Sequence, residues 1–150
     1  PVLSQRRSGR SALLQQFRDS RHAVLVGTDS FWEGVSVKGD ALRLVIIPRL
    51  PFRVPTEPLL VARREALTRR GLDAFNAYSL PKAVIRLKQG YGRLIRARTD
   101  RGVVLFLDRR LHDRSYGRVM LASIPPARRV AGPWRRVRVE LERFYGAISG

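Results

Sequence analysis

The hydrophobic residues of this chain fall into short, nearly continuous runs, separated by longer stretches with helical spacing. Three runs rich in Val, Ile and Leu are predicted to be strands: His22–Gly27, Ala41–Pro48 and Gly102–Asp108. Apolar runs that do not alternate with polar residues are typical of parallel strands that are covered on both faces. A further short strand is expected at Val2–Ser4.

Between these runs, apolar residues recur every three or four positions. This spacing predicts helices at Ser11–Asp19, Pro58–Arg70, Pro81–Arg96 and Asp113–Ala122. Two of these segments open on a proline, which is favoured in the first turn of a helix, and Thr56 is the expected cap of the first of them. The alternation of strands and helices indicates an α/β fold, with helices on both faces of a parallel sheet.

The end of the chain is expected to be a separate element, after a break at Pro125 and Pro126. Trp134–Ile148 has apolar residues on one side and arginines elsewhere. We therefore expect residues 127–150 to form a C-terminal amphipathic helix that packs on the domain formed by residues 1–126.

Composition narrows the choice of partner. The 150 residues fit one domain, and 30 Lys and Arg against 12 Asp and Glu give a net charge of +18. Such an excess favours nucleic acid as the partner over an anionic membrane, and no apolar run approaches the length of a membrane span. Cysteine is absent and the two histidines lie far apart, so we expect no metal site in this chain.

The segment 81–96 carries the most informative polar residues. On a helix, Gln89, Arg93 and Arg96 fall within roughly a 60° arc of one face. Guanidinium groups on a rigid element are suited to phosphoryl transfer, because charge must be stabilised on the phosphoryl oxygens. A solvated or nucleic-acid-facing basic surface is the alternative, and for Lys82 and Arg86 on the same helix solvation and phosphate steering are equally good interpretations.

A second group of polar residues follows the first long strand, where ligands bind in open α/β sheets. Thr28 and Ser30 offer hydroxyls for phosphate contacts, and Glu33 can accept hydrogen bonds from a ribose. Gly34 lets the backbone approach a ligand closely. Trp32 is either a core residue or a stacking platform for bases. Turn formation and capping explain most of this loop equally well.

The order of these segments resembles the second motor domain of superfamily 2 helicases of the DinG/XPD type. Motif VI of that family, Gln-x-x-Gly-Arg-x-x-Arg, is matched by Gln89, Gly92, Arg93 and Arg96, and motif V by Phe31–Ser36. The closing Gly-Val-Val-Leu-Phe-Leu-Asp-Arg-Arg-Leu run and the Tyr-Gly pair at 116 and 117 favour the bacterial DinG branch. The resemblance covers about residues 11–126, and it implies a RecA-like domain whose N-terminal edge is truncated.

The resemblance implies ATP hydrolysis between two such domains and movement along single-stranded DNA in the 5′-to-3′ direction. Arg93 and Arg96 would be arginine fingers, and Gln89 would position the nucleotide or the attacking water. The remaining implied contacts are with the nucleotide, at Glu33, Gly34, Ser36 and Gly92, and with DNA, at Thr28, Ser30 and Trp32. Arg49, which follows a predicted strand, is a further candidate for contact with DNA or with the partner domain.

One departure from the family pattern, and two elements that the chain lacks, bear on its expected activity. Ser36 stands where the family usually has aspartate, and a neutral hydrogen bond from serine is about half as strong as one to a carboxylate. The chain also has no phosphate loop and no acidic pair for Mg²⁺, which the family keeps in its first motor domain. Any iron–sulfur cluster is likewise expected outside this chain. Alone, the chain is expected to be inactive as an ATPase.

The resulting hypothesis is one half of a monomeric bacterial DNA helicase, cytoplasmic and associated with the nucleoid. Its expected partners are single-stranded or forked DNA and the first RecA-like domain of the same parent chain. The alternative is a non-catalytic basic nucleic-acid-binding domain derived from a helicase motor. A structural basic protein without any nucleotide is disfavoured by the two motifs in their family order.

Overall fold

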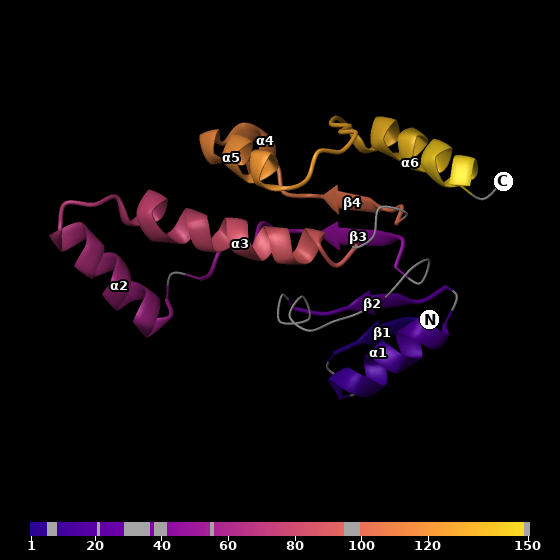
Figure 1. The fold of residues 1–150 in the computed structure, drawn as a ribbon, viewed down its shortest axis with the longest axis horizontal. Helices are drawn as coiled ribbons and strands as arrows, with labels where there is room; N and C mark the ends of the chain where they lie inside the picture. Colours follow the sequence, from indigo (N-terminus) through magenta and orange to yellow (C-terminus); the bar gives the residue numbers. More distant parts are fainter. Residues whose placement is uncertain are drawn as a thin grey trace.

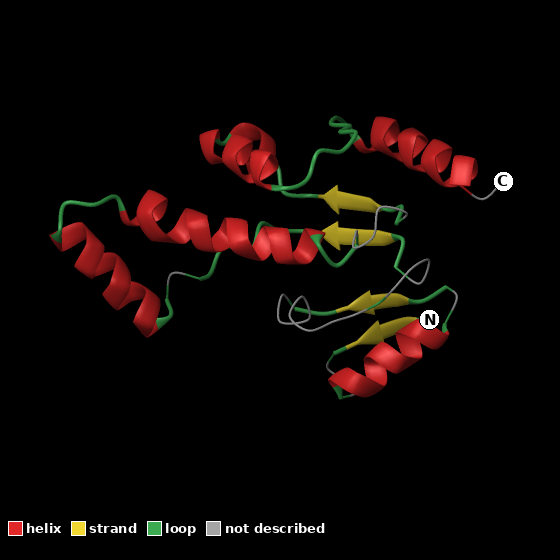
Figure 2. Ribbon diagram, in the orientation of Figure 1, coloured by secondary structure: helices red, strands yellow, loops and turns green. Residues whose placement is uncertain are grey.

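Two pairs of parallel strands form the middle of the molecule in the computed structural model (Figure 1). The structure describes residues 1–5, 9–20, 22–28, 37, 42–54, 56–94 and 100–148. The first pair joins β1 (Val2–Ser4) to β2 (Val24–Val26), and the second joins β3 (Leu44–Ile47) to β4 (Val103–Phe106). All the strands point the same way in Figure 2. The carboxyl ends of β2 and β3 therefore lie on the same side of the molecule.

The predicted α/β architecture with parallel strands and a C-terminal helix is confirmed. β1 has the predicted bounds, whereas the other strands are shorter than the apolar runs that contain them. In β3 the side chains of Leu44 and Ile46 are exposed, while Ile47 is buried. One face of this strand is therefore directed to the core, as expected from the alternation of side chains along a strand.

The first helices differ from the prediction mainly at their ends. α1 (Arg10–Asp19) packs against β1 and β2, and α2 (Pro58–Arg69) starts at the predicted proline. The expected cap at Thr56 is wrong, because the residue before the helix is Glu57, whose backbone is extended. The first position of the helix suits Pro58, whose fixed φ and missing N–H fit there. A π-helical turn at Phe75–Ser79 (η3), which the sequence did not predict, connects α2 to the next helix.

α3 (Leu80–Tyr91) ends earlier than the predicted Arg96. The backbone N–H of Arg93 donates to the carbonyl of Gly90 at 3.2 Å, and that of Leu94 to the carbonyl of Tyr91 at 3.1 Å. These three-residue spacings tighten the chain into a turn. Glycines at 90 and 92 lower the helix propensity at this point, which explains the early end.

Three helices follow β4 in the described part of the chain. The predicted helix at 113–122 is divided into α4 (Arg110–Asp113) and α5 (Ser115–Ser123), because Arg114 between them has extended backbone. α6 (Trp134–Ile148) has the predicted bounds. The hydroxyl of Tyr145 in α6 donates to the backbone carbonyl of Arg43, just before β3, at 2.8 Å.

The larger hydrophobic core lies between the second strand pair and the helices α3 and α5. Ile47, Leu87 and Met120 each expose 1% of their surface or less. A smaller core between α1 and the first strand pair contains Leu13 and Phe17. Leu87 of α3 is fully buried in the same core as Ile47 of β3, and this fixes the position of the polar residues at the carboxyl end of α3.

Candidate site at the carboxyl ends of the strands

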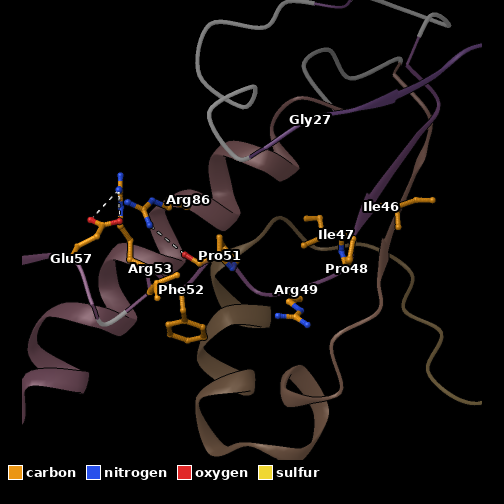
Figure 3. Close-up of a pocket in the computed structure, with 11 residues that line it drawn as sticks. Gly27, Ile46, Ile47, Pro48, Arg49, Pro51, Phe52, Arg53, Glu57 and Arg86 are labelled. Carbon is orange, nitrogen blue, oxygen red and sulfur yellow. Dashed lines mark hydrogen bonds and ion pairs between the residues drawn. The ribbon is translucent and has the colours of Figure 1, made fainter. Parts of the chain in front are cut away.

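A cavity of about 500 Å³ opens beside the carboxyl ends of β2 and β3 (Figure 3). The lining comes from Gly27 after β2, from the end of β3 and the following loop (Ile46 to Val54), from Glu57 and from Arg86 of α3. Within that loop Leu50 is buried and does not line the cavity. In parallel α/β sheets the carboxyl ends of the strands are where ligands bind. The cavity is therefore the candidate site that the fold provides.

Among the described residues, the lining of the cavity is positively charged. Its charged groups are the arginines at 49, 53 and 86 and the carboxylate of Glu57. A guanidinium nitrogen of Arg53 is 2.9 Å from Oε1 of Glu57, so this pair is neutral as a unit. Arg86 donates to the backbone carbonyl of Pro51 at 3.5 Å. Within the described part of the chain, neither Arg49 nor Arg86 has an acidic partner.

The loop behind the cavity is held by Asp108, the second residue after β4. Its carboxylate accepts a hydrogen bond from the backbone N–H of Leu50 at 2.8 Å and another from Nη2 of Arg110 at 2.6 Å. The Asp108 side chain is only 8% exposed. The hydrogen bonds from Arg110, together with that from Leu50, hold the pKa of this carboxyl far below its ordinary value, although burial acts in the opposite direction.

Phe52 fixes the same loop from its other side. Its ring lies 5.7 Å from the ring of Phe75 in η3 and 5.4 Å from that of Tyr116 in α5. The guanidinium of Arg110 lies over the Phe52 ring, 5.7 Å from its centre. The loop is thus held both by a backbone hydrogen bond to Asp108 and by the ring of Phe52. The backbone at Arg49 and Arg53 is therefore fixed in position.

Asp108 and Arg110 were not among the candidate residues of the sequence. Asp108 was predicted only as the last residue of a strand, and both residues lie in the run that suggested the DinG branch. The available signal was an acidic residue at the carboxyl end of a predicted strand, where a parallel sheet presents its site residues.

The structure brings two motif VI residues together. Gln89 lies in the last turn of α3, and Nε of Arg93 donates to its backbone carbonyl at 3.2 Å. Gly92 ends the helix with φ −66°, so its backbone does not require glycine; a Cβ there would lie 3.2 Å from the carbonyl oxygen of Lys88. Because the helix ends at Tyr91, the proposed arc of three side chains on one helical face does not hold for Arg93. Arg96 lies outside the described residues.

Of the second group of polar residues, Thr28 is described. Both its N–H and its hydroxyl lie within hydrogen-bond distance of the side-chain carbonyl of Gln5, at 3.2 and 3.1 Å. This connects the loop after β2 to the end of β1. The other members of the group lie outside the described residues: Ser30, Trp32, Glu33, Gly34 and Ser36. Arg49, predicted to contact DNA or the partner domain, lines the cavity.

Comparison with known proteins identifies the family. Residues 1–127 match the model of the helicase C-terminal domain. The chain belongs to this family. The resemblance to DinG-type helicases, drawn from the motif VI and motif V residues, is therefore confirmed.

Curated relatives agree with the family. The ATP-dependent DNA helicase YoaA of Escherichia coli is 54% identical over 138 residues, which are 92% of this chain and 22% of that protein. The ATP-dependent helicase DinG of Mycobacterium tuberculosis is 44% identical over 84% of this chain and 19% of its own length. A Bacillus subtilis relative, 45% identical over 75% of this chain and 12% of its own, is named 3′-5′ exonuclease DinG. The chain spans about a fifth or less of these relatives.

Among the described residues, no helix combines the length and apolar character needed to cross a membrane. In the same residues, no three His, Asp or Glu side chains come together as a metal site would require.

Proposed function

We propose that the chain is the second motor domain of an ATP-dependent DNA helicase that moves 5′ to 3′ along single-stranded DNA. The observation that carries this proposal is the hydrogen bond between Nε of Arg93 and the carbonyl of Gln89 at the end of α3. This hydrogen bond orients the guanidinium of Arg93. The proposal is further supported because the chain belongs to the helicase C-terminal domain family and is similar to proteins named as ATP-dependent helicases.

Arg93 is suited to binding a phosphoryl group. Its planar guanidinium can form two parallel hydrogen bonds with phosphate oxygens, and the bond to Gln89 limits the orientations it must lose on binding. Arg93 and Arg96 act as arginine fingers on the γ-phosphate of ATP, and Gln89 positions the nucleotide or water. ATP supplies the phosphoryl group whose negative charge these residues stabilise.

The remaining site residues divide between two ligands. Glu33, Gly34, Ser36 and Gly92 contact the nucleotide. Thr28, Ser30, Trp32 and Arg49 contact the DNA strand. The positive cavity containing Arg49 supports a DNA contact at the carboxyl ends of the strands.

The chain provides one wall of the ATP site. The phosphate loop and the Mg²⁺ ligands belong to the first motor domain of the parent chain, since the sequence here has neither. We therefore expect the isolated chain not to hydrolyse ATP. The complete protein acts as a monomer on single-stranded or forked DNA, in the bacterial cytoplasm.

The test is ATP hydrolysis by the complete protein, with and without single-stranded DNA. Arg96→Ala should lower DNA-stimulated turnover by about 10³–10⁵-fold, the range found for arginine fingers, and leave DNA affinity nearly unchanged. Arg135→Ala removes an equal charge from the exposed face of α6 and should have no effect on turnover. Absence of turnover in the unmodified protein would contradict the proposal.

A non-catalytic nucleic-acid-binding domain is the second candidate, favoured by the net charge of +18 and by Ser36 in motif V. In that case Arg96→Ala weakens DNA binding modestly and lowers the slope of log affinity against log salt by about one unit. The same two variants therefore distinguish the candidates.

A further inference from the structure

We propose that the cavity at the carboxyl ends of β2 and β3 binds a phosphate group through Arg86, with Arg49 as its second cation. Arg86 lies outside motif VI and outside the loop after β2, and the family resemblance assigns it no role. The inference rests on the proposed function, because it assigns a phosphate contact to the same motor domain.

The first argument is the balance of charge. Arg53 is paired with Glu57, and Arg49 and Arg86 have no carboxylate partner within the described ranges. The hydrogen bond of Arg86 to the Pro51 carbonyl, at 3.5 Å, is long, and it adds no negative charge. Two guanidinium groups in a concave site attract an anion more strongly than the same groups on a convex surface.

The second argument is the apolar part of the cavity lining. Ile47, which is 1% exposed, lines the cavity together with Pro48 and Pro51 (Figure 3). An apolar wall reduces screening by water and strengthens a charge-assisted hydrogen bond. The volume of about 500 Å³ falls in the range of roughly 300–1,000 Å³ typical of ligand sites.

The third argument is preorganisation. The loop that carries Arg49 is held at Leu50 by the Asp108 carboxylate, and Arg86 extends from a helix anchored by the fully buried Leu87. Both backbones are therefore fixed before a ligand arrives, which lowers the entropy lost on binding. Arginines placed in this way form a site for phosphate.

Two phosphates are available to such a site in this protein: the backbone phosphate of single-stranded DNA and the phosphate groups of the nucleotide. Both are oxyanions that arginine binds in the same geometry. The experiment must therefore measure the affinity for each one separately.

The test compares Arg86→Ala and Arg86→Lys in the complete protein, with Arg69→Ala on the exposed face of α2 as the control for charge. Anisotropy of a labelled oligo(dT), measured without nucleotide at several salt concentrations, reports DNA binding. The KM for ATP at saturating oligo(dT) reports nucleotide binding. Thermal unfolding checks that the variants fold. If Arg86→Ala does not fold, the same two assays are made on Arg49→Ala.

If the cavity binds a DNA backbone phosphate, Arg86→Ala should weaken oligo(dT) binding several-fold and lower the slope of log affinity against log salt by about 0.7, the value for one contact with a single strand. If the cavity binds a nucleotide phosphate, Arg86→Ala should raise the KM for ATP several-fold and leave DNA affinity unchanged. In both cases Arg86→Lys, which keeps the positive charge, should show a smaller loss than Arg86→Ala. The proposal would be overturned if the Ala variants had the same DNA affinity and the same KM for ATP as Arg69→Ala.

Arg96→Ala, measured in parallel, separates this inference from the proposed function. If Arg96→Ala abolishes turnover and Arg86→Ala changes neither affinity, only the phosphate site is disproved. If the unmodified protein shows no turnover, the motor function fails, and oligo(dT) binding by the Arg86 and Arg49 variants still decides whether the cavity binds phosphate.

Discussion

The carboxylate of Asp108 accepts a 2.8 Å hydrogen bond from the backbone N–H of Leu50, 58 residues earlier in the chain. This contact joins the end of β4 to the end of β3. Because Leu50 is only 3% exposed, water cannot readily replace the carboxylate as its partner. The position of the arginine-bearing loop therefore depends on this acidic side chain together with the aromatic contacts of Phe52.

Replacing Asp108 by alanine should destabilise the protein. The buried N–H of Leu50 loses its partner, and leaving such a donor unpaired costs about 1–3 kcal/mol. Urea unfolding followed by circular dichroism measures the change. Asp113→Ala is the control: it removes the exposed ion pair between Asp113 and Arg109, and pairs of this kind contribute about 1 kcal/mol or less. Equal effects of the two substitutions would contradict the role of Asp108.

Because of the same carboxylate, we expect the free energy of unfolding to depend on pH in the acidic range. Its pKa in the folded protein lies far below its ordinary value of 3.8, so its contribution is fully present above about pH 5. That contribution is lost as the pH falls from 3.8 towards the folded pKa, because the unfolded chain takes up the proton first. Measured from pH 7 to pH 2, the free energy difference between the unmodified protein and Asp108→Asn should stay constant above pH 5 and shrink below pH 4. A difference that stays constant over the whole range would contradict this prediction.

Gly117 should not tolerate a side chain. A Cβ at this position in α5 would overlap the backbone carbonyl of Leu111, which cannot move aside as a flexible side chain does. Overpacking of this kind costs about 1–3 kcal/mol or more, so Gly117→Ala should lower the unfolding midpoint. Gly146→Ala in α6 meets no atom within 4 Å and should be neutral or stabilising, because alanine favours helix. Thermal unfolding of the two variants makes the comparison.

Tyr145 should contribute to the attachment of α6. Its hydroxyl donates to the carbonyl of Arg43 at 2.8 Å, and Tyr145→Phe should lower the free energy of unfolding by about 0.5–1.5 kcal/mol. Burial raises the pKa of this phenol above 10, with a smaller opposing effect from the charge of Arg43. The stability it adds is therefore present below pH 10 and lost as the pH rises through the folded pKa. The stability of the unmodified protein should approach that of Tyr145→Phe in this alkaline range, and a gap that persists would count against the contact.

Local patterns in the sequence determined the elements and the family. The bounds of β1 and α6 agree with the prediction, because short apolar runs and helical periodicity depend on neighbouring residues alone. The end of α3 at Tyr91 was missed although Gly90 and Gly92 lower the helix propensity there, and no adjacent glycine or proline marks the break at Arg114. The residues of motif VI were identified from their spacing, whereas the bond between Arg93 and Gln89 required the turn that ends α3.

The cavity was decided by tertiary structure alone. Leu50 and Asp108 are 58 residues apart, and Tyr145 reaches a carbonyl 102 residues away. Periodicity carries no information over such separations, because the pairing of β3 with β4 and the burial of Leu87 and Met120 bring these groups together. The sequence determined which residues carry charge, and packing determined that Arg49 and Arg86 line one cavity in which the carboxylate of Glu57 is already paired with Arg53.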